Sequence, residues 1–205
     1  MAYFHQIKLL SMIAEDVNTL IRTRRSVFPK DYTGDPVSDS VISTMLENAN
    51  WAPTHKLTEP WRFIIYSGDG RKKLAQLQSE VYKTVTQADG TFREERYENL
   101  KKKPLESSHI ILVYMKRDEK KSVPEIEEAG AVFCAVQNMY LTATANGAGC
   151  YLSTGGVTYF PEAKAAFGLS EEDKIIGFLH VGVPQHNHQT SKRIPVDTKV
   201  VWIKE

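Results

Sequence analysis

The chain has 205 residues, of which 41% are hydrophobic, and its 26 Lys+Arg and 25 Asp+Glu give a formal net charge of +1. This length and composition predict one folded domain with a substantial core and exclude a disordered chain. The near-neutral charge argues against a nucleic-acid-binding protein, because such proteins carry a broad basic surface.

The sequence also gives expectations about compartment and domain limits. No apolar run reaches 18 residues, so no membrane-spanning helix is predicted. Cys134 and Cys150 lack the spacing of a disulfide framework or a zinc site. The first residues do not resemble a signal peptide, so we expect a soluble, cytoplasmic protein. We expect an N-terminal extension over residues 1–11, with Met12 as an alternative start, and a single domain over residues 12–205.

The first half of the chain alternates predicted helices with one strand. Apolar spacing predicts a helix over residues 12–22 and a second helix that begins after Ser38 and ends before Pro53. Trp61–Tyr66 reads as a strand, and the segment from Arg71 to about Tyr82 as a helix.

Residues 83–107 are polar and show no clear period. They predict a mobile excursion with some helix around Thr91–Leu100, in a place suited to substrate selection. The continuous apolar run His109–Met115 predicts a strand that is buried on both faces.

A long helix is predicted from Pro124 to Gly147, with acidic residues in its first turn. Its side chains are small or apolar nearly all round, which indicates burial on most sides and suggests a partner subunit. A short helix over Pro161–Phe167, a strand over Lys174–Val181 and a terminal strand over Val200–Ile203 complete the chain. Few strands without regular βαβ alternation favour an α+β fold.

Searches for common catalytic and binding motifs find little. The chain has no P-loop, GxGxxG, GxSxG or HExxH pattern. His186 and His188 lie in a polar stretch without a third ligand nearby, so we predict a surface loop and no metal site.

Short polar segments remain, and each has a structural and a functional interpretation. Arg24-Arg25-Ser26 and Lys192-Arg193 suit a phosphate but are also typical of solvated chain. Leu152-Ser153-Thr154 precedes two glycines that let a flat ligand approach the backbone. Trp51 and His55 flank a stiff turn at a helix exit, which by itself is a turn with a packed Trp.

Taken in order, these segments resemble the nitroreductase family of FMN flavoproteins, and above all its YdjA-type branch of bacterial NAD(P)H nitroreductases. The resemblance runs over about residues 12–200. Further parts of it are Pro60-Trp61-Arg62-Phe63, Asn146–Gly149, Lys174–Phe178 and Gly182–Gln185.

The resemblance implies an α/β sandwich with a mainly antiparallel central sheet flanked by helices. It also implies an intertwined homodimer with C-terminal strand exchange and two FMN at the interface. The implied FMN-binding residues are Arg24, Arg25, Ser26, Leu152, Ser153, Thr154, Lys192 and Arg193, with Trp51 and His55 contacting the FMN of the other subunit. The implied nicotinamide nucleotide stretch is Thr142, Ala143, Thr144, Ala145, Asn146 and Gly147, which also has a plain structural role as a helix end.

The implied activity is an FMN-dependent NAD(P)H oxidoreductase that reduces a nitroaromatic, a quinone or a similar acceptor by a ping-pong mechanism. FMN itself carries the hydride, so no catalytic side chain is expected. Arg24 or Arg25 is the candidate for a positive group near the flavin N1–C2 edge, and Glu59 replaces a Gln found in many relatives. Other flavin chemistry, namely dehalogenation, desaturation or flavin cleavage, and a non-catalytic FMN-binding dimer remain open.

Overall fold

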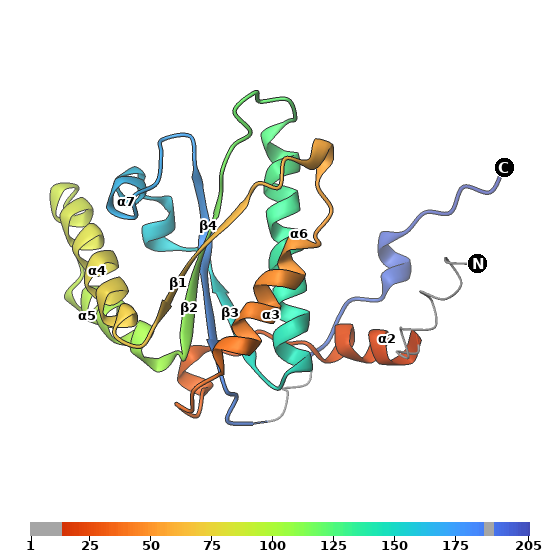
Figure 1. The fold of residues 1–205 in the computed structure, drawn as a ribbon, viewed down its shortest axis with the longest axis horizontal. Coiled ribbons are helices and arrows are strands. Elements are labelled where there is room, and N and C mark those ends of the chain that lie inside the picture. Colours follow the sequence, from red (N-terminus) through yellow and green to blue (C-terminus); the bar gives the residue numbers. More distant parts are fainter. Residues whose placement is uncertain (1–13, 187–190) are drawn as a thin grey trace.

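The computed structural model describes residues 14–186 and 191–205. The predicted 1–11 extension, Met12 and His188 lie outside these residues. The described chain forms an α+β fold around one four-stranded sheet, with helices on both faces (Figure 1). None of its helices is long and apolar enough to cross a membrane.

The sheet is antiparallel throughout, as expected, with strand order β1-β2-β4-β3. The strands are β1 (Trp61–Ser67), β2 (His109–Met115), β3 (Gly149–Ser153) and β4 (Lys174–Gly182). Strand β2 lies at the predicted residues and is buried along almost its whole length, because it is central and covered on both faces.

Two helices cover one face of the sheet. They are α3 (Asp39–Asn50) and α6 (Glu125–Ala145), and both lie to the right of the sheet in Figure 1. Met45 and Met139 are completely buried in the core that these helices form with β2 and β4. The other face is covered by α4 (Gly70–Ala88), α5 (Glu94–Lys102) and α7 (Pro161–Ala166). Helix α2 (Ala14–Thr23) precedes the sheet at the side of α6.

Three expectations require correction. The segment 83–107 is largely helical: α4 runs on to Ala88, α5 follows, and a short 3-10 helix occupies Lys103–Glu106. Its few apolar residues, among them Tyr97 and Leu100, pack against the core on the α4 face of the sheet. The mostly polar composition of the segment hid this helical packing from the sequence analysis. Strand β3 was not predicted, since its glycine-rich sequence shows no alternation. Val200–Ile203 is not a strand in the single chain, because a strand needs a neighbour with which to pair.

Helix α6 spans the expected residues, and Gly147, with φ of +74°, follows its end in the left-handed conformation. It is not buried on all sides in the single chain. Phe133 is 49% exposed and Ile126 is 78% exposed, so an apolar face of α6 remains open.

Candidate functional site

The residues of two distant predicted segments meet at Tyr140 on α6. The backbone N–H of Leu152 donates to Tyr140 Oη over 2.7 Å, and Tyr140 also forms a side-chain hydrogen bond with Ser26. The guanidinium of Arg24 lies over the Tyr140 ring, 5.1 Å from its centroid. We call these four residues the Tyr140 junction.

Backbone pairing fixes this junction. The N–H of Val27 donates to the carbonyl of Cys150 over 2.9 Å, and Ser26 and Cys150 form a parallel bridge. The residues after α2 therefore run alongside β3. Burial raises the pKa of Tyr140, so the phenol stays protonated at the centre of the junction.

Arg25 points back along its own helix. Its Nη1 donates to the carbonyls of Arg22 over 2.5 Å and Arg24 over 2.8 Å, at the end of α2 where cations are favoured. Of the two neighbouring arginines, Arg24 is the one that the structure places on the Tyr140 junction.

A second cluster, not predicted from the sequence, lies behind β3 and shares Ser153 with the predicted cofactor segment. This cluster, the β3 pocket, has a volume of about 270 Å³. Its lining residues are Gln78, Arg96, Asn99, Leu100, Lys103, Tyr151, Ser153, Gly155, Gly156, Val157, Phe178 and His180.

The charges of the β3 pocket are positive. Arg96 and Lys103 line it, no carboxylate does, and neither cation forms an ion pair within the described chain. Lys103 Nζ lies 4.8 Å from the centroid of the Tyr151 ring, and burial lowers the pKa of Lys103. The pocket is therefore suited to an anionic or electron-rich group.

His180 is a buried member of the β3 pocket lining. It is 5% exposed, and its Nδ1 lies 2.9 Å from Ser107 Oγ. Burial, with a further contribution from the positive charge of Lys103, lowers the pKa of His180 to about 3. The imidazole is therefore neutral at physiological pH.

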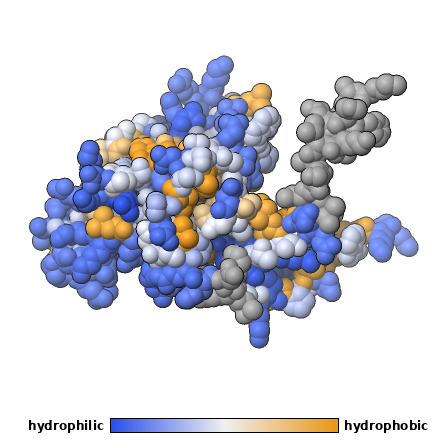
Figure 2. Space-filling view, turned by 60° about the horizontal axis from the view of Figure 1, so that its bottom comes forward, coloured by the Kyte–Doolittle hydropathy of each residue, from blue (hydrophilic) through white to orange (hydrophobic). Residues whose placement is uncertain are grey.

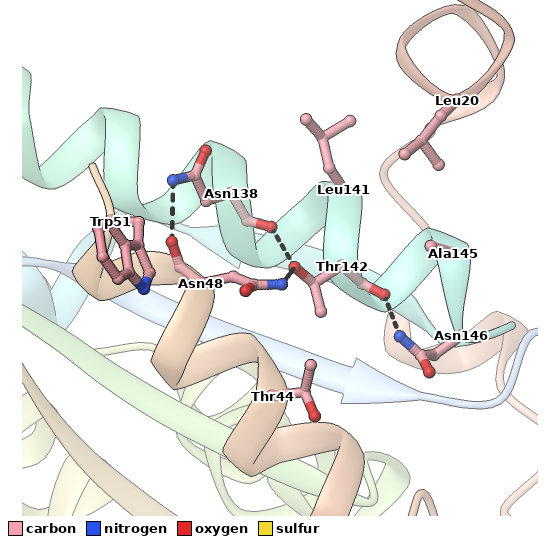
Figure 3. Close-up of a pocket in the computed structure, with 9 residues that line it drawn as sticks. All are labelled: Leu20, Thr44, Asn48, Trp51, Asn138, Leu141, Thr142, Ala145 and Asn146. Atoms are coloured by element: carbon pink, nitrogen blue, oxygen red, sulfur yellow. Dashed lines mark hydrogen bonds between the residues drawn. The ribbon is translucent and has the colours of Figure 1, made fainter. Parts of the chain in front are cut away.

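A third feature is the groove between α2, α3 and α6 shown in Figure 3, with a volume of about 400 Å³. It contains Thr142, Ala145 and Asn146 of the predicted nucleotide stretch, together with Trp51, which is 77% exposed. Ala143 of the same stretch is fully buried in the core, so it cannot face the groove.

Amide and hydroxyl groups hold the walls of this groove together. Asn48 Nδ2 donates to Thr142 Oγ1 over 2.9 Å, and Asn138 Nδ2 donates to the carbonyl of Asn48 over 2.9 Å (Figure 3). Asn146 Nδ2 donates to the carbonyl of Thr142 over 2.8 Å. Among the described residues, no lysine or arginine lines the groove.

The other predicted residues lie apart from these clusters or are simply exposed. His55 pairs with Glu127 at the start of α6. Arg193 donates to Ser191 and to the carbonyl of Lys192, both in the C-terminal segment, and its contact with FMN stays a prediction. Thr154 and Glu59 are exposed. Among the residues that the structure describes, no group of three His, Cys, Asp or Glu side chains could hold a metal ion.

Sequence comparison places this geometry among known proteins. Residues 21–183 match the sequence profile of the nitroreductase family. The chain is 35% identical over 160 residues to YdjA of Escherichia coli strain K12, covering 78% of this chain and 85% of that protein. It is 30% identical over 177 residues to YfhC of Bacillus subtilis strain 168, covering 86% and 89%. Both proteins carry the name putative NAD(P)H nitroreductase.

Solved structures with the same fold also superpose on this chain. A nitroreductase-like family protein from Bacillus cereus superposes with a TM-score of 0.80 at 30% identity, over 92% of this chain and 96% of that one. A nitroreductase-type protein from Desulfovibrio desulfuricans, solved in complex with FMN, gives a TM-score of 0.70 at 25% identity, over 92% and 97%.

Proposed function

The chain belongs to the nitroreductase family, and from this premise we propose that it is an FMN-dependent NAD(P)H oxidoreductase. Its acceptor is a nitroaromatic, a quinone or a similar small molecule. When bound, FMN supplies the chemistry by taking a hydride from NADH or NADPH and passing it to the acceptor in a ping-pong sequence.

The observation that carries this proposal is the Tyr140 junction on the α6 face of β3, together with the β3 pocket on the opposite face of the same strand. A flavin mononucleotide needs cations for its phosphate and pyrimidine edge, and backbone and hydroxyl groups along its ring. Arg24, Ser26 and Leu152 meet at Tyr140, and Ser153 extends the same strand into a pocket whose charges are positive. The residues present thus fit this cofactor in both charge and polarity.

The structure favours a different cation for the pyrimidine edge from the one suggested by the sequence. Arg24 lies on Tyr140 and Arg25 donates to carbonyls at the end of its helix. Lys103 shares the β3 pocket with Ser153 and is not engaged in an ion pair within the described residues. We therefore assign to Lys103 the positive charge that stabilises the reduced flavin.

The proposed working unit is a homodimer with two FMN at the interface. Within residues 14–186 and 191–205, the apolar face of α6 is open and β1 is an edge strand with no partner on its outer side. The C-terminal residues Val201, Trp202 and Ile203 are each at least 79% exposed, and in Figure 1 they project away from the body of the molecule. A strand exchanged between subunits would cover both the tail and the edge.

The test is spectroscopic. The purified full-length protein is expected to be yellow, with a flavin spectrum that bleaches anaerobically when NADH or NADPH is added and returns when a quinone or nitroaromatic follows. Arg24→Ala and Lys103→Ala are expected to weaken FMN binding measured by fluorescence titration. A colourless protein that takes up no FMN would refute the proposal and favour a structural dimer. A flavin that neither nicotinamide reduces would point to other flavin chemistry on the same fold.

A further inference from the structure

The loop between α3 and β1 is held in a costly backbone conformation. Lys56, Leu57 and Glu59 have φ values of 52°, 55° and 42°, in the left-handed region that residues other than glycine rarely adopt. Such conformations persist only where surrounding contacts fix them, and they gather at functional sites.

Two contacts tie the loop to the beginning of α6. His55 Nδ1 lies 2.5 Å from Glu127 Oε2, and Lys56 Nζ donates to the carbonyl of Ser122 over 2.8 Å. Within the loop, Thr54 Oγ1 accepts from the N–H of Glu59 over 3.1 Å. His55 is thus held from the side of α6 through one specific ring nitrogen.

We propose that Glu127 is a positioning residue for the cofactor, acting through His55. An imidazole has two nitrogens, and the carboxylate of Glu127 engages Nδ1, so Nε2 is the atom left to face a ligand. The inference rests on the proposed function, in which His55 contacts the FMN of the other subunit. The carboxylate fixes the ring orientation, as outer carboxylates do for histidines that bind metals.

The neighbouring acidic residues show that geometry, and not charge alone, distinguishes Glu127. Glu125 pairs with Lys174 across the surface, and Glu128 is buried against Arg117 and accepts from the N–H of Asp118. All three carboxylates lie in the first turn of α6, where the helix dipole favours negative charge. Glu125→Ala is therefore a matched control that removes the same charge from the same helical turn.

The first measurement needs no cofactor. Ring ¹⁵N shifts of His55 in the full-length, flavin-free protein report which nitrogen carries the proton. We expect hydrogen on Nδ1 in the wild type and in Glu125→Ala, and a return to the Nε2–H form usual in water for Glu127→Ala. Glu127→Gln retains a carbonyl acceptor and is expected to lie between them. An unchanged His55 in Glu127→Ala would overturn the inference.

The second measurement is a double-mutant cycle on FMN affinity. Glu127→Ala is expected to weaken binding about fivefold, as for the loss of one hydrogen bond, and to have no further effect in a His55→Ala background. Additive effects of the two substitutions, or an equal loss in Glu125→Ala, would refute a role through His55. If the wild-type protein binds no FMN, the proposed function itself is refuted. If the wild type and Glu127→Ala bind FMN equally well, only this inference is refuted.

Discussion

The buried, neutral His180 makes the stability of the folded protein depend on pH. Burial lowers its pKa in the folded protein to about 3, whereas an unfolded histidine titrates near the usual 6.5. Between pH 6.5 and pH 3, His180 is therefore protonated in the unfolded chain but stays neutral in the folded chain. The stability that the neutral ring contributes is present above pH 6.5 and is lost as the pH falls towards 3.

We predict that His180 lowers the free energy of unfolding by on the order of 1 kcal/mol per pH unit over this range. This loss adds to the contributions of other titrating groups. Urea unfolding of the wild type and of His180→Gln between pH 7 and pH 4 measures it. The variant has a lower stability at pH 7 but is expected to show a shallower decline. Equal slopes for the two proteins would show that His180 does not titrate as described.

At the level of elements, β3 is the strand that assembles the site, and it depends on a glycine. A Cβ added at Gly149 would lie 2.9 Å from Val27 Cβ and 3.0 Å from Pro184 Cγ, closer than such atoms normally approach. Only glycine allows β3 to pack so closely on the residues that follow α2. The same approach aligns Ser26 with Cys150 and brings Arg24 to Tyr140.

Gly149→Ala is accordingly expected to cost roughly 1–3 kcal/mol of stability through overpacking, and to weaken FMN binding because the Tyr140 junction is displaced. Urea unfolding and fluorescence titration measure the two effects. Gly70→Ala is the control, since its Cβ would meet Tyr66 Cβ at an ordinary 4.0 Å. If Gly149→Ala behaved like Gly70→Ala, β3 would tolerate movement and the packing argument would fail.

At the level of the molecule, the described chain leaves many large apolar side chains exposed. Figure 2 shows apolar side chains reaching the surface at several places on one face, between polar regions. The largest exposed hydrophobic side chains include Trp51, Leu57, Ile126, Phe133, Tyr159, Val201, Trp202 and Ile203. Patches of this kind mark protein–protein contacts more often than free surface.

If the proposed homodimer depends on the C-terminal strand, removal of residues 196–205 is expected to give a monomer slightly below the full-chain mass of 23.2 kDa in sedimentation analysis. Trp202→Ala is expected to raise the dimer dissociation constant, because a large buried aromatic contributes strongly to an interface. Lys199→Ala in the same segment serves as the control. A truncated protein that remains dimeric would exclude strand exchange as the basis of the dimer.

Much of the fold is encoded in local patterns. The apolar run of β2 and the apolar spacing and termini of α3 and α6 follow from residues close in sequence, and all three elements lie within a residue or two of their expected bounds. Local patterns failed at α5 and β3. Few of the residues of α5 are apolar, and β3 owes its existence to pairing with β4.

The sequence by itself determined the α+β class, the central strands β2 and β4, the extent of the long helix α6 and the polar segments that resemble a flavin site. Only the tertiary structure decided that Tyr140 links Arg24, Ser26 and Leu152, that Lys103 and Arg96 share one pocket, and that Glu127 holds His55. The physical reason is the distance along the sequence between the interacting residues. Helices and buried strands are set by side-chain periodicity among near neighbours. The contacts of Tyr140 with Arg24 and of Glu127 with His55 instead join residues dozens of positions apart, which meet only when the sheet and its covering helices pack.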